Sequence, residues 1–358
     1  FLFYEIITLV TYPLVAHKET PEAYEGGGKY LWYLIGTSKV FLLPAVILTF
    51  VFAGTLNFKA GGIFPGEIVS QEKTVLTVVF FLFIFGFAKA AVMPFHNWLP
   101  SAMVAPTPVS ALLHAVAVVK VGVFSIVRMI YFIFGPETLQ TLNVGITTAY
   151  IASFTIIISS VIALTKDNLK ARLAYSTISQ LSYIVLGMAM LSVSGMTGGM
   201  IHITNHAFSK ITLFFCAGAI YVAAHKTKIS ELNGIARKMP WTMAAFSIGA
   251  MNMIGMPLFA GFVSKWYLAL GSIESKHISL LIVLIVSSIL NACYFLPIIY
   301  AAFFKELPEG ESPEKHEAPI AMVVPLTLTA IGTLLLFFNS STLIELANLI
   351  LSAPGGGN

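Results

Sequence analysis

The sequence predicts an all-α fold, a polytopic bundle of transmembrane helices, on the basis of its composition and its recurring apolar stretches. Of the 358 residues, 57% are hydrophobic and 10% are charged, whereas soluble domains are nearer half apolar and a quarter charged. Each apolar stretch is long enough to cross a hydrocarbon core of roughly 30 Å as a helix. Because backbone polar groups in lipid must be satisfied within their own segment, these stretches are expected to be helical. The segments of alternating polarity that are typical of a membrane β-barrel are not seen.

About ten spans of this kind are expected, followed by a short amphipathic helix near 341–352. Prolines mark several joints between spans, as at Pro21, Pro65 and Pro240. The chain begins at Phe1 inside an apolar run and without an initial Met, so an N-terminal part of the natural protein is expected to be missing. The expected spans lie near 1–17, 30–54, 74–97, 108–135, 141–165, 173–194, 198–224, 239–271, 277–304 and 318–340.

The lysines and arginines of the expected loops are distributed unevenly. When the spans alternate across the membrane, eleven of these residues fall on one face and three, Lys59, Lys73 and Lys276, on the other. Loops rich in Lys and Arg stay in the cytoplasm, so the face with eleven of them is predicted to be cytoplasmic. The predicted location is the cell (inner or plasma) membrane, with several passes across it. The net charge of +4 lies mostly in these loops and does not indicate nucleic-acid binding. The loops predicted to be cytoplasmic are 18–29, 98–107, 166–172, 225–238 and 305–317.

Several ionisable residues lie inside the expected spans and are the main candidates for function. A charge at the bilayer centre costs roughly 2.5–3.5 kcal/mol on insertion scales, so a sequence that keeps several of them is expected to use them. Arg128 is interpreted as mainly structural, and Lys39 is a further candidate that could line a cavity. The others are Glu5, Lys89, His114, Lys120, His202, His206, Lys210 and Lys265.

Two of these lysines accompany residues that interrupt helices. Lys89 precedes Pro94, and Lys265 follows Gly255 and Pro257. Proline removes a backbone donor and breaks a helix, and paired interrupted helices point to the ion site of a transporter built from two related halves. The alternatives are a lysine that snorkels to the membrane interface and a simple kink with an interfacial lysine.

His114 and Lys120 lie six residues apart in one span. This spacing points their side chains about 120° apart around the helix, within roughly two turns. Histidine and a buried lysine can both exchange protons near neutral pH, so the two residues are interpreted as successive stations of a relay. For His114 the alternative is a histidine that only packs.

His202, His206 and Lys210 recur with a period of four and therefore share one helix face, with a rise of roughly 6 Å between them. This pattern predicts a proton relay bridged by water. Polar packing is one alternative. A zinc site is another, because histidines four residues apart can ligate a metal. However, residues 203–205 include no acidic side chain, and Lys210 would oppose a metal cation.

Glu5 supplies a carboxylate within the first span. If it pairs with Lys89, the ammonium stays charged, and if the pair separates, Lys89 can release a proton. The hypothesis is therefore a switch controlled by one distance. The alternative is that Glu5 only caps a helix end.

Three further strings complete the pattern: Lys166-Asp-Asn-Leu-Lys-Ala-Arg-Leu-Ala-Tyr-Ser176-Thr-Ile-Ser-Gln180, the His-Asn-Trp-Leu-Pro run at 96–100, and Ala16-His-Lys-Glu-Thr-Pro-Glu-Ala. Together with the motifs above, they resemble the antiporter-like subunits of Mrp cation/proton antiporters and of the complex I superfamily, over essentially the whole chain. The resemblance implies two inverted five-helix repeats, each with a broken helix, and a first repeat that here lacks about four helices. It divides the chain into 1–135, the remainder of the first repeat with a break around 86–100; 141–304, the second repeat with a break around 239–271; and 305–358, a last span and a short helix.

The resemblance also implies roles for individual residues. The Lys on the second broken helix looks like that of the D-type Mrp subunit. The implied relay consists of the Glu–Lys pair Glu5 and Lys89, the central Lys120, the histidine helix with His202, His206 and Lys210, and the terminal Lys265.

The partners that the resemblance implies are paralogous antiporter-like subunits and small membrane subunits, with a hydrogenase, sulfur-reductase or quinone-reductase arm in respiratory relatives. This chain has no Cys cluster, flavin motif or dinucleotide fingerprint, so no cofactor or metal is expected in it, and iron–sulfur or other redox centres are assigned to partners. The expected function is proton translocation, or exchange of H⁺ for Na⁺. The alternatives are a secondary transporter of a small solute and a structural subunit that no longer pumps. An intramembrane metalloprotease is disfavoured because no acidic residue follows His202.

Overall fold

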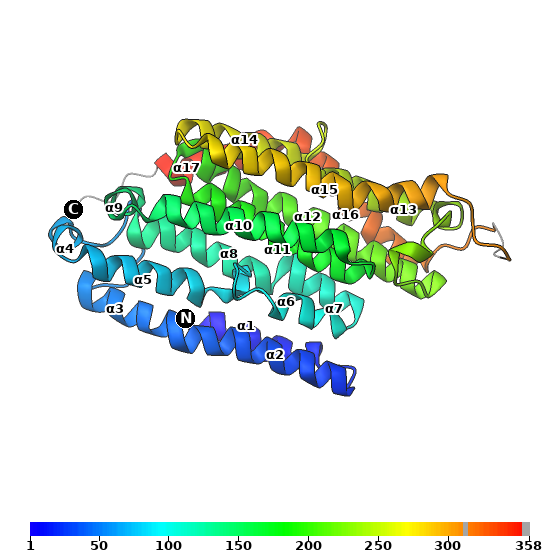
Figure 1. Cartoon of the computed structure of the whole chain (residues 1–358), viewed down its shortest axis with the longest axis horizontal. Coiled ribbons are helices and arrows are strands. Elements are labelled where there is room, and N and C mark those ends of the chain that lie inside the picture. The colour runs from blue at the N-terminus through cyan, green and yellow to red at the C-terminus, as the bar shows by residue number, and fades with distance from the viewer. Residues whose placement is uncertain (311–313, 353–358) are drawn as a thin grey trace.

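The computed structural model describes residues 1–310 and 314–352, and it is an elongated bundle whose long helices run side by side (Figure 1). The described residues form helices and no strand, with one isolated bridge between Asn168 and Lys228. The predicted all-α class is therefore confirmed.

The predictions for loop 305–317 and for segment 305–358 fall partly on 311–313 and 353–358, which lie outside the described residues. The helices are α1 (Leu2–Val15), α2 (Pro21–Thr37), α3 (Leu43–Ala53), α4 (Gly66–Gln71), α5 (Lys73–Gly86), α6 (Trp98–Ser101), α7 (Thr107–Ala111), α8 (Val118–Arg128), α9 (Pro136–Leu142), α10 (Val144–Thr165), α11 (Leu169–Ala189), α12 (Val193–Ala224), α13 (Pro240–Ile254), α14 (Ala260–Glu274), α15 (Ile278–Phe304), α16 (Ile320–Phe338) and α17 (Ser340–Ser352).

Several of these helices continue into one another and are long enough to cross a membrane. Short π-helical turns at Ser38–Leu42 and Leu112–Val116 join α2 to α3 and α7 to α8. Among the described residues, six stretches are long and apolar enough to span: Pro21–Ala53, Thr107–Phe134, Val144–Thr165, Val193–Ala224, Ile278–Phe304 and Ile320–Phe338. The chain is thus a multi-pass membrane protein, while the count of about ten spans stays a prediction.

The second helix begins earlier than the sequence analysis predicted. Residues 21–29 were assigned to a loop, but α2 starts at Pro21. The Thr20 Oγ1 accepts a hydrogen bond from the Ala23 backbone N–H at 3.2 Å, and proline suits the first helical position because its missing N–H is not needed there. Lys29 also pairs with Glu25 one turn away at 2.7 Å. The cap and this pair explain why a polar, glycine-rich segment is helical.

Three other boundaries were also wrong by a few residues. The predicted loop 98–107 contains α6, and the predicted loop 166–172 ends where Asn168 caps α11 through a bond from Ala171 N–H at 3.0 Å. The span predicted to start at 198 begins at Val193, where the Ser192 side chain caps α12. For α11 and α12 a capping side chain begins the helix before its apolar stretch, whereas α6 has no side-chain cap.

Both predicted helix interruptions are present. After α5 the chain leaves the helix, forms a short 3₁₀ turn at Ala88–Ala90 and becomes α-helical again only at α6. The second interruption separates α13 from α14 at 255–259, where Gly255 adopts a φ of +88°. Glycine adopts this left-handed conformation without a Cβ clash, which suits the end of a helix.

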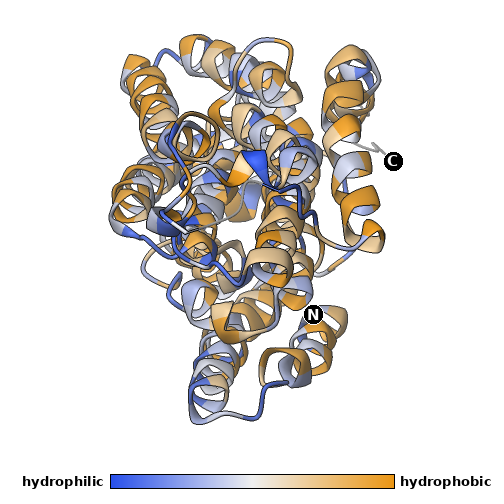
Figure 2. Ribbon diagram, turned by 90° about the vertical axis from the view of Figure 1, so that its right-hand side faces the viewer, coloured by the Kyte–Doolittle hydropathy of each residue, from blue (hydrophilic) through white to orange (hydrophobic). Residues whose placement is uncertain are grey.

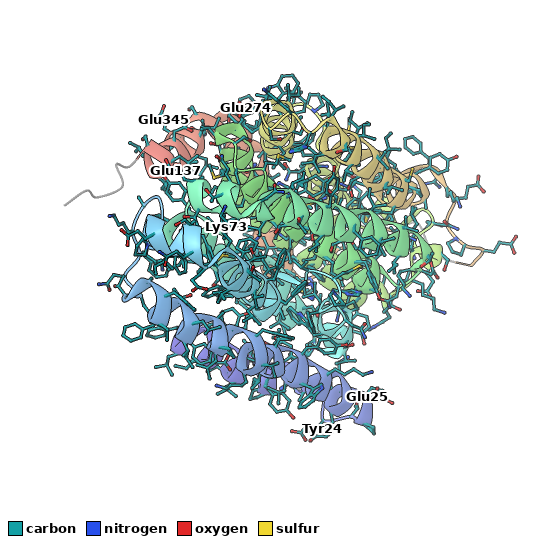
Figure 3. All side chains as sticks on the ribbon, turned by 60° about the vertical axis from the view of Figure 1, so that its left-hand side comes forward. Tyr24, Glu25, Lys73, Glu137, Glu274 and Glu345 are labelled. Carbon is teal, nitrogen blue, oxygen red and sulfur yellow. The ribbon has the colours of Figure 1, made fainter. Side chains whose placement is uncertain are left out.

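The loops predicted to share one face of the membrane contact one another at one end of the bundle. The Leu169 N–H donates to the Thr227 carbonyl at 2.9 Å, and the Gly234 N–H donates at 2.9 Å to the carbonyl of Ala301, in the last turn of α15 before the predicted loop 305–317. Figure 3 shows Lys73, Glu137, Glu274 and Glu345 at the opposite end from Tyr24 and Glu25. The alternation of loops is therefore consistent with the prediction, and which end faces the cytoplasm stays a prediction.

Apolar side chains cover the outside of the bundle as well as its core. Figure 2 shows hydrophobic residues on the outward faces of the peripheral helices and polar residues mainly in connecting segments. Large exposed apolar residues include Trp32 on α2, Ile289 on α15 and Leu328 on α16. Such a surface suits lipid. The buried polar residues are consequently the unusual feature of this molecule.

Candidate functional site

The predicted ladder on α12 lies in the middle of the bundle. His202, His206 and Lys210 are 2%, 1% and 0% exposed, and the two imidazole ring centroids are 6.2 Å apart. Helix α12 packs against α7, α11, α13, α14 and α16. A helix with neighbours on so many sides can keep polar groups away from lipid, as intramembrane ionisable residues require.

Lys120 joins α8 to this ladder. Its Nζ lies 2.6 Å from His206 Nδ1, and both side chains are buried. In a hydrogen bond between an amine and an imidazole nitrogen, one atom donates and the other accepts. The contact therefore places a proton between two groups that can each hold it.

His202 extends the chain of contacts towards the second broken helix. Its Nε2 lies 3.0 Å from Gln180 Oε1 on α11, and its Nδ1 lies 2.8 Å from Ser264 Oγ on α14. Ser264 immediately precedes Lys265. His202 therefore contacts the residue that directly precedes Lys265 in the sequence.

Lys210 is connected to the end of α13, beside Lys265, through a second series of hydrogen bonds. Its Nζ donates to the Leu173 carbonyl at 3.1 Å and to Ser176 Oγ at 2.8 Å. The Tyr294 hydroxyl lies 3.1 Å from Ser176 Oγ and also bonds to Asn291 Oδ1. The Asn291 amide in turn donates to the Met253 carbonyl at 3.3 Å, at the end of α13.

Lys265 occupies the second interruption. Its ammonium donates to the Met253 and Ile254 carbonyls at 3.0 and 2.8 Å and to Ser288 Oγ at 3.2 Å. These carbonyls belong to the last turn of α13, which has no helical partners for them and carries the negative end of the helix dipole. The predicted broken helix thus binds its own predicted lysine.

Lys89 occupies the first interruption and is fully buried. Its Nζ donates to the Tyr4 backbone carbonyl and lies 3.5 Å from the centre of the Tyr4 ring. Glu5 follows Tyr4 on α1, yet the carboxylate of Glu5 and the ammonium of Lys89 are not within ion-pair distance. The structure brings the two predicted partners to the same place but not into direct contact.

Lys89 and Lys120 lie on packed elements. A Cβ built at Gly122 on α8 would overlap the Ala90 backbone nitrogen and Lys89 itself. Gly122 is therefore needed for the close approach of α8 to the Ala88–Ala90 turn, two residues along the chain from Lys120. The first interruption and the central ladder are joined at this crossing.

The remaining candidates differ in their surroundings. His114 is buried with its ring 5.0 Å from the Phe214 ring, and neither of its nitrogens has a hydrogen-bond partner among the described residues. Lys39 is exposed and lies 4.8 Å from the Phe1 ring. It is therefore outside the buried chain, the name used here for the row of Lys89, Lys120, His206, His202 and Lys265 with Lys210. Arg128 stacks on Phe58 at 3.6 Å, which agrees with its structural interpretation.

Unpaired polar atoms accompany the buried chain. Glu5 Oε1, both nitrogens of His114, His206 Nε2 and Asn205 Oδ1 are buried without a protein hydrogen-bond partner in the described part of the chain. Buried polar atoms in folded proteins nearly always have a partner, and ordered water commonly supplies it. These atoms therefore mark places where water would complete the network.

Sequence reasoning missed the neutral members of this network. Ser176 and Gln180 on α11 bond to Lys210 and His202. Tyr294 on α15 bonds to Ser176, and Asn291 bonds to the Met253 carbonyl that Lys265 also binds. Their spacings of four and three place each pair on one helix face, so polar residues at helical spacing within apolar spans were an available signal. The Tyr4 carbonyl gave none, because every residue has one.

The chain is a multi-pass α-helical bundle with two interrupted helices and ionisable residues at the interruptions, an arrangement that is also typical of broken-helix membrane transporters. Residues 1–291 match the family described as NADH:quinone oxidoreductase/Mrp antiporter, TM. The chain belongs to this family, and the resemblance found in its sequence is confirmed.

Two relatives and two solved structures illustrate this membership. NADH-quinone oxidoreductase subunit N of Desulforudis audaxviator is 34% identical over 359 residues, which cover 94% of this chain and 68% of that protein. Subunit L of Mycobacterium tuberculosis is 34% identical over 297 residues, covering 82% and 46%. A chain of the Mrp complex from Dietzia sp. DQ12-45-1b is 25% identical, with a TM-score of 0.85 over 99% of this chain and 74% of that one. A chain of the membrane-bound sulfane sulfur reductase, an archaeal respiratory membrane complex, is 27% identical, with a TM-score of 0.84 over 98% and 70%. The chain spans about half the length of several curated relatives.

Proposed function

We propose that this chain translocates protons across the membrane as one subunit of a larger assembly. The observation that carries the proposal is the buried contact between Lys120 and His206 at 2.6 Å, which links the element beside Lys89 to the ladder leading to Lys265. The relatives are subunits of NADH-quinone oxidoreductases, and the structural neighbours come from Mrp and sulfane sulfur reductase complexes. A row of single titratable groups suits a proton better than a solute, which would need a roomy polar pocket.

The proposed steps follow the order of these residues through the bundle, with direct hydrogen bonds between Lys120 and His206 and between His202 and Ser264. An ammonium at Lys89 gives its proton to neutral Lys120, with water as the connection, and Lys120 gives its own to His206. His206 passes a proton to His202, and Ser264 connects His202 to the surroundings of Lys265. Movement of Glu5 towards or away from Lys89 would favour the charged or the neutral amine and so control the first step.

The second interruption favours H⁺ over Na⁺ as the ion carried by this chain. In broken-helix transporters, the carbonyls at the end of a half-helix coordinate the cation. Here the carbonyls of Met253 and Ile254 already accept hydrogen bonds from Lys265. In an assembly that exchanges H⁺ for Na⁺, we therefore place the sodium path elsewhere.

The partners proposed for this chain are paralogous antiporter-like subunits, small membrane subunits and, where the assembly is respiratory, a redox arm. The structural neighbours come from an Mrp complex and from an archaeal respiratory membrane complex, and the apolar outer faces of the bundle provide the area for contacts with partners. Any iron–sulfur or other redox centre that drives translocation would belong to these partners. The loops 18–29, 98–107, 166–172, 225–238 and 305–317 are proposed to face the cytoplasm.

Replacing Lys120 tests this function in the intact assembly. Inverted membrane vesicles containing the complex are energised, and proton uptake is measured with a pH-sensitive dye for wild type, Lys120→Met and the control Lys73→Met. Lys73 starts α5 at one end of the bundle and lies outside the buried chain. Uptake should fall at least about tenfold only in Lys120→Met. Unchanged uptake by a fully assembled Lys120→Met complex would mean that the chain supports assembly and does not conduct.

A further inference from the structure

A pocket apart from the buried Lys and His residues lies beside the start of α7, and Figure 1 labels this helix. The pocket has a volume of about 700 Å³ and lies between the start of α7, the start of α11, the last turns of α12 and the start of α16. This volume is within the range of roughly 300–1,000 Å³ typical of small-molecule sites. All four elements end here in loops that the charge distribution assigns to one face of the membrane.

The walls of the pocket are mainly apolar. Phe214, Phe215 and Val222 of α12 face Met322 and Pro325 of α16 across it. Gly218 lines the slot between these helices, and a Cβ built there would lie 3.2 Å from Thr107 Cγ2, 3.5 Å from Thr107 Cβ and 3.8 Å from Met322 Cε, so the missing side chain contributes to the width of the slot. A hydrocarbon chain fits such a slot, because its burial needs no hydrogen-bond partner.

The mouth of the pocket is basic. Lys18, Lys170 and Lys226 line it, from three separate segments of the chain, and no Asp or Glu is among the described lining residues. Lys170 Nζ donates one hydrogen bond to the Ala105 carbonyl at 2.7 Å. A lysine ammonium has three donors, so this bond orients Lys170 and leaves it able to bind an anion.

We propose that this pocket binds an anionic phospholipid, with the phosphate at Lys18, Lys170 and Lys226 and one acyl chain between α12 and α16. Basic pockets between transmembrane helices at the cytoplasmic side are the setting in which anionic head groups bind. The charge and the apolar slot are both required, and here they share one opening. The proposal does not depend on the proton-relay function.

Two other pockets provide a comparison for the proposed lipid site, because their linings differ in charge. One of about 470 Å³ is lined by Phe85, Met93, Tyr150 and Phe154 among others, and its lining has no charged residue. Another, of about 500 Å³, has Glu317 beside apolar residues of α16. Neither combines apolar walls with cationic side chains, so selectivity for an anionic lipid is expected at the first pocket and not at these two.

The bound lipid would also contact Phe214, the residue whose ring packs against His114. Phe214 lines the pocket, and its ring lies 5.0 Å from that of His114. An acyl chain against Phe214 would keep water in the pocket away from His114. Lipid binding and proton conduction are nevertheless separate measurements.

The test uses the full assembly in vesicles of phosphatidylcholine that contain a photoactivatable phosphatidylglycerol or, in parallel, a photoactivatable phosphatidylcholine. Crosslinked peptides are quantified by mass spectrometry. Phosphatidylglycerol should label the segments around Met103 and Met322, which line the pocket, more strongly than phosphatidylcholine does. Removing pocket charge with Lys18→Gln, Lys170→Gln and Lys226→Gln should reduce this preference by roughly fivefold per lysine, given the attraction of one lysine to an anionic surface.

Two further variants make the result decisive. The control triple variant Lys166→Gln, Lys228→Gln and Lys305→Gln removes the same charge from the same end of the bundle, outside the pocket, and should keep the preference. Gly218→Leu fills the slot without changing charge and should abolish labelling by both lipids, with unchanged subunit content on native gels showing that the assembly is intact. An equal loss in the control triple variant, or full labelling in Gly218→Leu, would overturn the proposal.

Discussion

The two interrupted helices hold their lysines in different ways. At the second interruption, Lys265 donates to two carbonyls at the end of its own broken helix and to Ser288. At the first, the Gly86 and Ala88 carbonyls accept from the Tyr4 hydroxyl at 3.5 Å and from Trp98 Nε1 at 2.9 Å. The Gly86 and Ala88 carbonyls of the first interruption are thus bound by aromatic side chains. Lys89 instead donates its hydrogen bond to the Tyr4 carbonyl on α1.

This difference separates a fixed charge site from an adjustable one. The acceptors of Lys265 belong mostly to the same broken segment and keep their positions together. Lys89 depends on the Tyr4 carbonyl and on the neighbouring Glu5, both on α1. A small shift of α1 changes the electrostatic environment of Lys89, because interaction energy varies inversely with distance and is strong in a weakly polar interior. We infer that the first interruption is the controlled step and the second is the fixed end of the path.

The largest effect is expected from Lys89→Arg. Arginine keeps the positive charge but does not release its proton in proteins, so an adjustable proton site should fail even though its charge is intact. Proton uptake by vesicles is expected to fall about a hundredfold, the lower end of what one positioned proton-transfer group contributes. Subunit content on native gels controls for assembly. Wild-type uptake by Lys89→Arg would show that Lys89 contributes charge and not protons.

Lys265→Met is expected to act on stability more than Lys89→Met does. Without the ammonium, the Ile254 carbonyl loses its side-chain donor and the Met253 carbonyl keeps only the bond from Asn291, and a buried polar group left unpaired costs about 1–3 kcal/mol. Lys89→Met removes a bond from the Tyr4 carbonyl, which lies within α1, where the helix itself supplies a backbone N–H donor. Thermal unfolding of the purified assembly would compare the two variants directly, with Lys73→Met as the reference. Equal losses for both would remove the distinction between the fixed and adjustable sites.

Glu5→Gln is expected to reduce proton uptake roughly fivefold, less than any change of Lys89 itself, because it removes the influence on the proton site and leaves the site. The double variant Glu5→Gln with Lys89→Ala should behave like Lys89→Ala alone, since the two residues act as one unit. The measurement is the four-way comparison of uptake rates. Additive losses would separate Glu5 from Lys89 and contradict the switch.

The smallest effect concerns a loop far from both interruptions. Hydrogen bonds from the Ser230 hydroxyl and backbone N–H hold the pKa of the Asp167 carboxyl below its ordinary value of 3.8. Because the folded-state pKa is the lower one, this stabilisation is present at neutral pH and is lost as pH falls through that pKa. Asp167→Asn should lower stability by less than about 1 kcal/mol at neutral pH and by less still in acid. Thermal unfolding at the two pH values checks it, and a loss that grows in acid would contradict it.

The sequence predicted those parts of the site that depend on spacing within one helix. The face shared by His202, His206 and Lys210 and the interruptions beside Lys89 and Lys265 follow from periodicity and from Pro and Gly. Contacts between distant segments could not be predicted in this way. Nothing in the sequence indicates that Lys120 meets His206, or that Lys89 binds a backbone carbonyl of Tyr4, because these contacts depend on how the helices pack.

The boundaries of the elements were predicted less well than their existence. The glycine-rich start of α2 is helical because of the Thr20 cap, and residues near 98–104 are helical although prolines surround them. Caps and tertiary contacts act on a few residues at the ends of helices, where hydrophobic periodicity carries little information.

His206→Gln is the most direct test of the buried chain as a proton path. Glutamine keeps an amide oxygen that can accept the hydrogen bond from Lys120 but cannot take up and release a proton near neutral pH, so packing and polarity are largely preserved. Proton uptake is measured in inverted vesicles whose subunit content matches wild type. The account predicts that uptake collapses in His206→Gln and persists in Lys73→Met. Undiminished uptake in a fully assembled His206→Gln complex would show that protons do not pass through this chain of residues.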